Sequence, residues 1–336
     1  MPEELERRLG RVARLSYGGR PTALERLGRL TKQLGGPSLW IKRDDFLGPG
    51  MGGNKGRKLE FLMAEVLELG KRKVVTYGGL QSNHARMTAA ACAALGLEAH
   101  LFFMEKRPLA LRGNLLLDQL LGAKMHFIPI GGGGEASMTL ETANRLVRWG
   151  SFFFVGPGAY FMPVGGHTVR GCLGYVEAAL EIHRQVAEMG MERPVTVVTA
   201  AGTGGTLAGL LSGFTLLDSP VKVLGLDIGK LWKGFPASLA RLASGLCGAL
   251  GERREFRPED VPLIEGRYAG PGYGVMTAET EAAVKLLATQ EGIILDPVYT
   301  GKAFAGLLDL VKQGYFRPKE QIIFLHTGGG PGLFRD

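Results

Sequence analysis

Short apolar runs alternate with longer amphipathic stretches along most of this 336-residue chain. The short runs are rich in Val, Ile, Leu and Phe, which is typical of strands buried in a parallel sheet. They predict strands at residues 39–42, 73–77, 99–103, 125–130, 195–199, 221–226 and 321–325. The longer stretches repeat apolar residues at helical spacing and predict helices at residues 57–69, 83–95, 114–121, 139–149, 173–188, 277–290 and 302–311. Strands that alternate with helices of about 10–15 residues form βαβ units, so the pattern predicts an α/β protein with mainly parallel sheets.

Residues 151–166 break this alternation, because they are rich in glycine and aromatic residues and show no clear periodicity. This stretch is either a crossing between two domains or a core strand followed by a loop. The chain has no internal repeat and no low-complexity linker. Many of its 52 glycines stand beside apolar runs, which indicates tight turns and close backbone approaches.

Composition and charge narrow the possible functions. The formal charge of +8 comes from basic residues dispersed among acidic ones, so no nucleic-acid partner is expected. The three cysteines are far apart and form no CxxC pair, which argues against a disulfide framework and a metal site and fits a reducing compartment. The N-terminal residues do not form a secretory signal, and no apolar run reaches the roughly 18 residues of a membrane span. We therefore expect a soluble, cytoplasmic protein without a membrane partner.

Three glycine-rich segments stand where strands should end, and in open α/β sheets ligands bind beyond the carboxyl ends of the strands. The first, MGGNKGRKLEF at residues 51–61, leads into a helix. Lys55 stands at the start of that helix, where the helix dipole helps to lower the pKa of the amine and favours the uncharged form that a Schiff-base lysine needs. Basic residues are unfavourable at a helix start, so Lys55, Arg57 and Lys58 indicate an anionic ligand; the alternative is a solvated first turn.

The second segment, residues 77–96, turns after a strand and enters a helix that Ser82 or Asn83 caps. Capping does not account for the whole cluster Gln81-Ser82-Asn83-His84, which offers several donors to a carboxylate.

The third segment, AAGTGGTLAGLLSG at residues 200–213, follows the strand VTVVT. Its backbone amides and threonine hydroxyls predict a phosphate cradle at a helix N-terminus, formed by Gly202, Thr203, Gly204, Gly205 and Thr206. A dinucleotide-binding motif competes, because Asp227 ends the next strand, but that motif needs a third glycine where Leu207 stands. No lysine follows the glycines, so the segment is not a P-loop.

Two C-terminal segments add further polar groups. LDPVYTGKAFAGL at residues 295–307 opens a helix with Tyr299 and Thr300, and FLHTGGGPG at residues 324–332 places Thr327 beside a glycine loop. Neither segment is specific by itself, since a tyrosine at a helix start more often packs than reacts.

In their order along the chain, GGNKGRKLEF, GGLQSNHAR, GTGGTLAG, PGYG and DPVYTGK resemble the motifs of the 1-aminocyclopropane-1-carboxylate (ACC) deaminase and D-cysteine desulfhydrase family, whose members depend on pyridoxal 5'-phosphate (PLP). The resemblance runs from Pro21 to His326. It implies the tryptophan-synthase-β-like PLP fold of type II, with open, parallel-rich sheets. It also implies a homodimer and two domains: a larger PLP-binding domain formed by residues 1–55 and 171–336, and a smaller one formed by residues 56–170.

The resemblance further implies a role for each matching residue. Lys55 matches the lysine that binds PLP covalently, and Lys58 with residues 203–206 matches the phosphate contacts. The residues that match contacts to the cofactor ring are Asn83, Thr300 and Thr327. Those that match substrate contacts or catalytic groups are Ser82, Asn83, His84, Tyr273 and Tyr299.

Two threonines distinguish the branches of this family. ACC deaminases resemble this chain but carry a glutamate at the position of Thr300 and a leucine at that of Thr327. A carboxylate near the pyridine nitrogen makes the ring a stronger electron sink, and a hydroxyl cannot supply that charge. Since expelling a thiol is easier than opening a cyclopropane, the threonines favour β-elimination, and His84 is typical of the desulfhydrase branch. We expect D-cysteine, or a related β-substituted amino acid, to give pyruvate, ammonia and hydrogen sulfide, with Lys55 removing the α-proton and Tyr299 protonating the leaving group.

Other functions stay open at this point. ACC deamination to 2-oxobutyrate is one, and a nicotinamide-dependent oxidoreductase that uses residues 202–227 is another. A PLP-binding protein without catalytic activity is a third. The family often has a GGS-type loop where this chain has Gly165-Gly166-His167. If His167 and Arg170 line the pocket, Arg170 favours a more acidic substrate such as L-cysteate; otherwise both are surface groups. The sequence does not decide between D and L substrates.

Overall fold

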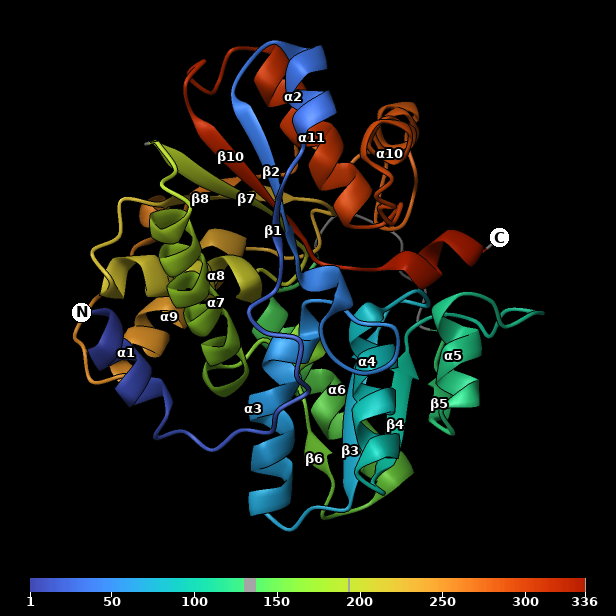
Figure 1. Ribbon diagram of the computed structural model, residues 1–336. Helices are drawn as coiled ribbons and strands as arrows, with labels where there is room; N and C mark the ends of the chain where they lie inside the picture. Colours follow the sequence, from blue (N-terminus) through green and yellow to red (C-terminus); the bar gives the residue numbers. More distant parts are fainter. Residues whose placement is uncertain (130–136, 193, 336) are drawn as a thin grey trace.

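The computed structural model describes residues 1–129, 137–192 and 194–335 and contains two sheets, the larger above the smaller in Figure 1. The larger sheet has the order β1 (Leu24–Arg26), β2 (Ser38–Arg43), β10 (Gln321–His326), β7 (Val195–Ala201), β8 (Lys222–Asp227) and β9 (Leu263–Ile264). The smaller sheet has the order β5 (Lys124–Phe127), β4 (Glu98–Phe103), β3 (Lys73–Gly78) and β6 (Tyr160–Phe161). Among the described strands only the β1–β2 pair is antiparallel. The predicted parallel-rich α/β fold is confirmed.

Helices cover both faces of each sheet, which explains why the strands read as nearly continuous apolar runs. In β7, Val197 packs into the core on the side of α7 (Val169–Glu188), α8 (Gly205–Leu216) and α9 (Phe235–Ala249). The next residue, Val198, packs into the core on the opposite side, with α2 (Gly28–Leu34), α10 (Ala278–Glu291) and α11 (Thr300–Lys312). Neighbouring side chains of a strand point to opposite faces, so both must be apolar here.

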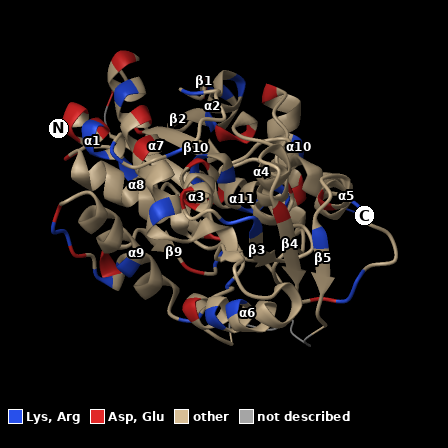
Figure 2. Ribbon diagram, turned by 90° about the horizontal axis from the view of Figure 1, so that it is seen from below, with Lys and Arg blue, Asp and Glu red and all other residues tan. Residues whose placement is uncertain are grey.

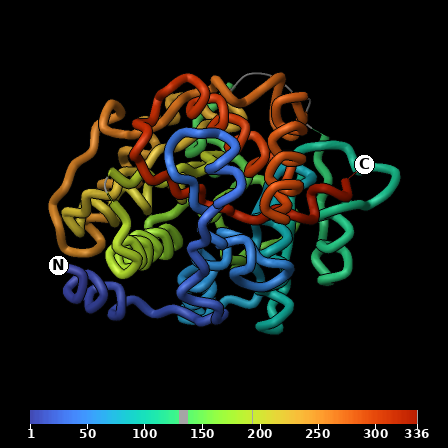
Figure 3. The backbone as a smooth tube through the Cα atoms, turned by 45° about the horizontal axis from the view of Figure 1, so that its top comes forward, coloured from blue at the N-terminus to red at the C-terminus, as the bar shows by residue number. Residues whose placement is uncertain are grey.

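The smaller sheet follows the same rule. Val74 packs with α3 (Lys55–Glu68), α4 (Asn83–Ala94) and α5 (Asn114–Leu120), and Val75 packs with α6 (Leu140–Val155). The N-terminal helix α1 (Pro2–Leu9) packs far along the chain, where Arg8 donates 2.7 Å to the carbonyl oxygen of Leu250; Figure 3 shows these segments side by side. Basic and acidic residues are interspersed over the elements (Figure 2). No described helix is long and apolar enough to cross a membrane.

Each predicted strand and helix is present, most of them within a few residues, but the helix predicted at 139–149 continues to Val155. The last residue of the strand predicted at 125–130 lies outside the described part. Residues 151–166 fit neither interpretation completely. They hold the last turn of α6, the short edge strand β6 and a tight turn at Val164–Gly166, and the chain then enters α7 beside the larger sheet. The pattern did not predict α1, α2 or α9. It also missed the three shortest strands, because two or three residues are too few to show a period.

Candidate active site

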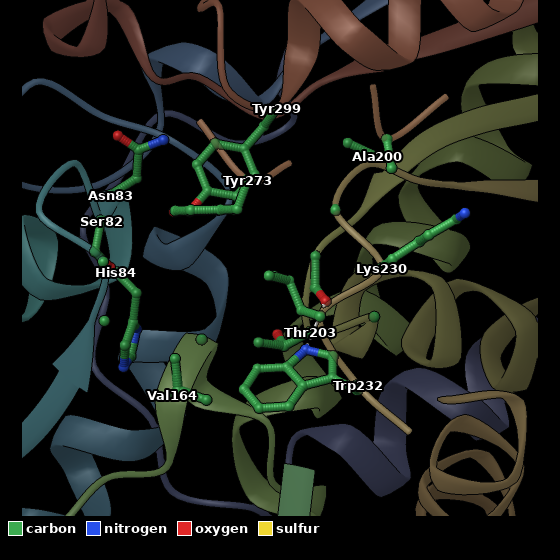
Figure 4. Close-up of a pocket in the computed structure, with 18 of the residues that line it drawn as sticks. Ser82, Asn83, His84, Val164, Ala200, Thr203, Lys230, Trp232, Tyr273 and Tyr299 are labelled. Carbon is green, nitrogen blue, oxygen red and sulfur yellow. Dashed lines mark hydrogen bonds between the residues drawn. The ribbon is translucent and has the colours of Figure 1, made fainter. Parts of the chain in front are cut away.

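A cavity of about 1260 Å³ is lined by the loops that follow strands of both sheets. From the smaller sheet come Gly78 at the end of β3, Gly79 after it and the start of α4. From the larger sheet come residues 202–206 after β7, residues 229–232 after β8, and Thr327 after β10. The carboxyl ends of parallel strands therefore meet at one place, as expected for a ligand site in an α/β protein. Figure 4 shows side chains from these loops facing one another across the cavity.

Lys55 is the first residue of α3 and lines the cavity. Its Nζ donates a 2.9 Å hydrogen bond to Oδ1 of Asn54, and Nδ2 of Asn54 donates at 3.0 Å to Oγ1 of Thr206. Burial, and next the positive charge of Lys58, hold the pKa of Lys55 well below its usual range. The pKa was expected to fall, but loss of solvent is the main cause rather than the helix dipole. The amine is therefore available in the uncharged form that covalent cofactor binding needs.

Lys58 lies one turn further along α3 and points to the same cavity. Only 1% of it is exposed, and its Nζ donates at 2.9 Å to the carbonyl oxygen of Gly165. Burial lowers the pKa of Lys58, and among the described residues no carboxylate pairs with it. A buried ammonium with one neutral partner indicates a site for an anion.

Arg57 does not belong to this anion site, and the interpretation of three cations as one group is wrong for it. Its side chain leaves a different face of α3, because a helix turns by about 100° per residue. Arg57 donates to both carboxylate oxygens of Asp44, at 2.8 Å each, and to both of Glu181, at 3.0 Å each. Its charge is therefore satisfied within the protein.

The glycine-rich loop after β7 can hold a phosphate. Gly204 adopts the left-handed conformation with φ 71°, and α8 begins at Gly205, so its first amides have no helical acceptor. A Cβ atom on Gly205 would lie 2.7 Å from Nζ of Lys58, which shows how closely the loop and this cation approach. The buried Nδ1 of His167 lies near this position and lacks a hydrogen-bond partner among the described residues. Amides, a cation and an unsatisfied buried ring nitrogen fit the phosphate of PLP.

The start of α4 forms the facing wall, with Ser82, Asn83 and His84 lining the cavity. Ser82 is the N-cap, as predicted, and accepts from the backbone amide of Ala85 at 3.2 Å. Burial, followed by the charges of Lys55 and Lys58, holds the pKa of His84 well below its usual range, so the ring is neutral. Gln81, expected among the donors, turns away: its Oε1 accepts from the amide of Asn114 at 2.9 Å.

Two tyrosines from the larger sheet's side complete the cavity. The hydroxyls of Tyr273 and Tyr299 are hydrogen-bonded to each other, and their ring planes lie at 72°. Burial raises the pKa of Tyr299 well above its usual value, and the adjacent phenol raises it further. Tyr299 therefore stays protonated at neutral pH and can act as a proton donor.

The two threonines that distinguish the branches lie differently. Thr327 lines the cavity. Thr300 is buried outside the lining residues, because its hydroxyl donates at 2.6 Å to Oδ1 of Asp296. The carboxylate of Asp296 also accepts from the backbone amides of Val298, Tyr299 and Thr300 at the start of α11.

Arg170 does not line the cavity, and His167 is not part of its lining either but lies behind Gly205, in the glycine-rich loop. Arg170 donates to Oε2 of Glu68 at 2.8 Å and to the carbonyl oxygen of Ala13, on the side away from the cavity. The argument for an acidic substrate therefore has no support from Arg170. The carboxylate of Asp227 accepts from the backbone amides of Gly229, Lys230 and Gly266, so it is not free to hold a ribose.

Several cavity residues were missed from the sequence, although each lies within a few residues of a recognised feature. Met104 and Glu105 come just after β4, Trp232 follows β8, and Asn54 precedes Lys55. Trp232 forms part of the wall, where its Nε1 donates at 3.0 Å to the carbonyl oxygen of Gly202 (Figure 4). Applying the strand-end rule to β4 and β8 would have found three of these four residues.

Comparisons with known proteins agree with this geometry. The family described as pyridoxal-phosphate dependent enzyme matches residues 15–328. Proteins named D-cysteine desulfhydrase from Klebsiella pneumoniae and Salmonella choleraesuis are 39% and 40% identical to this chain, and each match covers 97% of both proteins. A crystal structure described as an ACC deaminase homologue has a TM-score of 0.85 at 35% identity, over 99% of this chain and 97% of that one.

These matches decide between the classes left open above. A nicotinamide-dependent oxidoreductase is wrong, since the matched family uses PLP and Asp227 is occupied by backbone amides. The matched stretch includes every described residue that lines the cavity. Because the match spans both sheets and the whole site between them, the chain belongs to the family of pyridoxal-phosphate dependent enzymes, and its cofactor is PLP.

Proposed function

We propose that the protein deaminates D-cysteine, or a closely related β-substituted amino acid, by α,β-elimination to pyruvate, ammonia and hydrogen sulfide. The observation that carries the proposal is the buried Tyr273–Tyr299 pair in the same cavity as Lys55. It places a protonated phenol, suited to protonate a leaving thiolate, in one site with an uncharged amine suited to remove a proton. The two relatives named D-cysteine desulfhydrase support the same reaction.

Each step of the reaction can be given to a residue of this chain. The substrate carboxylate is held at the start of α4, where backbone amides, the Ser82 hydroxyl and Asn83 face the cavity. When bound, PLP supplies an electron sink for the electrons left on the α-carbon. Nζ of Lys55, with its lowered pKa, takes the α-proton as general base.

The C–S bond then breaks, its electron pair leaves on sulfur, and Tyr299 donates the proton that makes hydrogen sulfide. The proton on Lys55 can restore the phenol, and the released enamine reacts with water to give pyruvate and ammonia. Excluding bulk water from the site prevents side reactions during these steps. The apolar wall that includes Trp232 and Met104 contributes to this exclusion.

The test compares two substrates under identical conditions: pyruvate release from D-cysteine and 2-oxobutyrate release from ACC. We expect D-cysteine to react far faster, because neither Thr327 nor Thr300 can place a charge at the cofactor ring. Faster turnover of ACC would replace this proposal with ACC deaminase, the activity suggested by the structural neighbour's description. Sulfite release from L-cysteate, with neither of the other two products, would replace the leaving group.

The assignment of Lys55 has its own test. Borohydride reduction of the purified protein, followed by peptide mapping, should place the pyridoxyl mass on the peptide that contains Lys55. Its uncharged state and its contact with Asn54 support this, whereas Lys58 is held against Gly165. Modification of Lys58 instead would exchange the two roles.

We further propose that each sheet is the core of one domain, residues 1–55 with 171–336 and residues 56–170, and that the protein is a cytoplasmic homodimer. An apolar stripe on α6 supports self-association, because Leu146, Trp149 and Phe153 are 55%, 69% and 69% exposed at helical spacing. Light scattering at micromolar concentration should give twice the monomer mass. A monomer under these conditions would contradict the dimer and leave the reaction untouched.

A further inference from the structure

A chain of three buried polar side chains leads from the interior of the smaller sheet's helical layer to the cavity. Arg86 in α4 donates from Nε to Oδ1 of Asn114, at the start of α5, over 2.7 Å. Nδ2 of Asn114 then donates to Oδ1 of Asn83 over 3.0 Å. Arg86 and Asn114 are completely buried, and Asn83 lines the cavity. This series of hydrogen bonds therefore ends at Asn83, a residue that the reaction is expected to use.

The direction of these hydrogen bonds follows from chemistry alone. A guanidinium has donors and no acceptor, so the atom of Asn114 that faces Arg86 must be its oxygen. The other end of the Asn114 amide is then nitrogen, and it also donates at 2.9 Å to the carbonyl oxygen of Gln81, which can only accept. The atom of Asn83 that faces Asn114 must therefore be oxygen. The amide nitrogen of Asn83 is left on the cavity side, as Figure 4 shows.

Further hydrogen bonds hold Arg86 and Asn114 in place, so the donor–acceptor direction of this series cannot easily reverse. Nη2 of Arg86 donates at 3.2 Å to the carbonyl oxygen of Gly52, in the glycine loop that precedes Lys55, and at 3.5 Å directly to Oδ1 of Asn83. Asn114 is held by Gln81 through its own backbone amide as well as its side chain. An isolated asparagine could present either end of its amide to the cavity, but Asn83 cannot.

We infer that Arg86 and Asn114 are positioning residues that set the polarity of Asn83, so that its amide nitrogen donates to the hydroxyl oxygen carried by the PLP ring. The inference rests on the proposed function and on the family resemblance, which implies that Asn83 contacts the cofactor ring beside its hydroxyl group. A donor stabilises negative charge on the oxygen, whereas a reversed amide would place its own oxygen there and repel the charge. Nothing in the sequence pattern separates Asn114 from an ordinary residue at a helix start.

The test uses the affinity of the apoenzyme for PLP, followed by the visible absorption of the bound cofactor. Asn114→Asp keeps the size of the side chain but replaces its donor with an acceptor, so the Asn83 amide should turn to donate to it. Loss of a hydrogen bond to a charged group predicts that the dissociation constant of Asn114→Asp for PLP is roughly ten- to hundredfold higher. Asn114→Ala, which does not force the reversal, should weaken binding less. A residue that only supports the fold would show the opposite order.

A double-mutant cycle separates positioning from general structural effects. In an Asn83→Ala background, Asn114→Asp should change the affinity for PLP by less than about twofold, because the group it acts through is gone. The matched control is Gln119→Ala, an exposed residue of the same helix, which should bind PLP as the wild type does. Arg86→Lys keeps a donor and should bind PLP more tightly than Arg86→Met.

Two results would overturn the inference: wild-type affinity for PLP in Asn114→Asp, or an equal loss of affinity with and without Asn83. Both remain measurable if the Arg86 variants fail to fold. If Asn83→Ala itself binds PLP like the wild type, the ring contact belongs to another residue, and the inference fails while D-cysteine stays the proposed substrate. If D-cysteine is not turned over but the cycle behaves as expected, the proposed substrate fails and the inference stands.

Discussion

The two faces of α3 treat buried cations in opposite ways. On one face, Arg57 is surrounded by the carboxylates of Asp44 and Glu181, which raise its pKa well above the usual value. On the other face, Lys55 and Lys58 have only neutral partners, and burial lowers the pKa of both. Both kinds of cation stand within four consecutive residues. The helix therefore separates Arg57, whose charge is paired within the fold, from the two amines of the site only because their side chains leave it on different faces.

This difference shows what marks a binding site. A buried charge that is fully paired belongs to the fold, and Arg57 ties α3 to α7 and to the segment after β2. A buried cation without a countercharge costs stability unless a ligand supplies one. Fixing Arg57 on one side of α3 also determines where Lys55 and Lys58 point on the other.

The largest expected effect is on the paired face. Arg57→Met should lower the free energy of unfolding by about 3–5 kcal/mol, because it leaves the buried Asp44 carboxylate without its cation. The arginine lowers the pKa of Asp44 to about 2, so this stabilisation is complete at neutral pH and is lost as the pH falls from about 4 toward 2. Urea unfolding at both pH values measures it. A loss below about 1 kcal/mol at neutral pH would mean that the pair contributes little.

The second prediction concerns a buried carboxyl group that has no hydrogen-bond partner among the described residues. Asp118 is buried in α5, its carboxylate has no hydrogen bond among the described residues, and burial raises its pKa to about 8. The native state keeps this proton while the unfolded state loses it near pH 4, so stability falls as the pH rises between these values. A pKa difference of about four units makes this fall as large as about 5 kcal/mol at pH 8, so Asp118→Asn, which removes it, should stabilise the protein by up to this amount.

At pH 4 the Asp118→Asn variant and the wild type should unfold at the same urea concentration. The exposed Asp218→Asn is the matched control, expected to show no such difference between the two pH values. Equal stabilities of Asp118→Asn and wild type at pH 8 would show that water or an ion already satisfies the carboxylate.

On the face of α3 that carries Lys55 and Lys58, we expect a substitution to weaken cofactor binding and to leave stability nearly unchanged, the reverse of the effect expected at Arg57. Lys58→Met should leave the free energy of unfolding of the apoenzyme within about 1 kcal/mol of the wild type, because the charged amine is already disfavoured there. Its affinity for PLP should fall roughly tenfold, since a charge-assisted hydrogen bond to phosphate is lost. Exposed Lys32→Met serves as control for both measurements. A destabilised apoenzyme with unchanged affinity would make Lys58 a structural residue like Arg57.

The two faces also show how far the sequence could be interpreted. The apolar period predicted α3, and the position of Lys55 at its start was confirmed. That Arg57 would be paired could not be predicted, because Asp44 and Glu181 stand 13 and 124 residues away along the chain. Local patterns determine which face a residue takes on a helix, whereas partners depend on how distant elements pack.

The same limit applies to the cavity. The segments after β3, β7 and β10 were found because they are rich in glycine and polar residues, which are needed where a backbone approaches a ligand. Trp232 and Met104 line the same cavity but are apolar, and in a sequence they look like core residues. Thr300 shows the same limit from the other side, since a matching motif did not reveal that its hydroxyl would donate to Asp296.

The smallest effect is expected outside both faces, at Arg170. Its pair with Glu68 is partly exposed, with 27% and 48% of the two side chains accessible, so Arg170→Ala should change the free energy of unfolding by less than about 1 kcal/mol. Because the side chain does not line the cavity, the ratio of turnover between D-cysteine and L-cysteate should also stay the same. Exposed Arg184, which pairs with Glu6 in a similar way, provides the matched Arg184→Ala control. A change in the substrate ratio that appears in Arg170→Ala and not in the control would mean that Arg170 reaches the cavity during turnover. Arg170 would then belong with Lys55 and Lys58, as a third cation of the site that no buried carboxylate pairs.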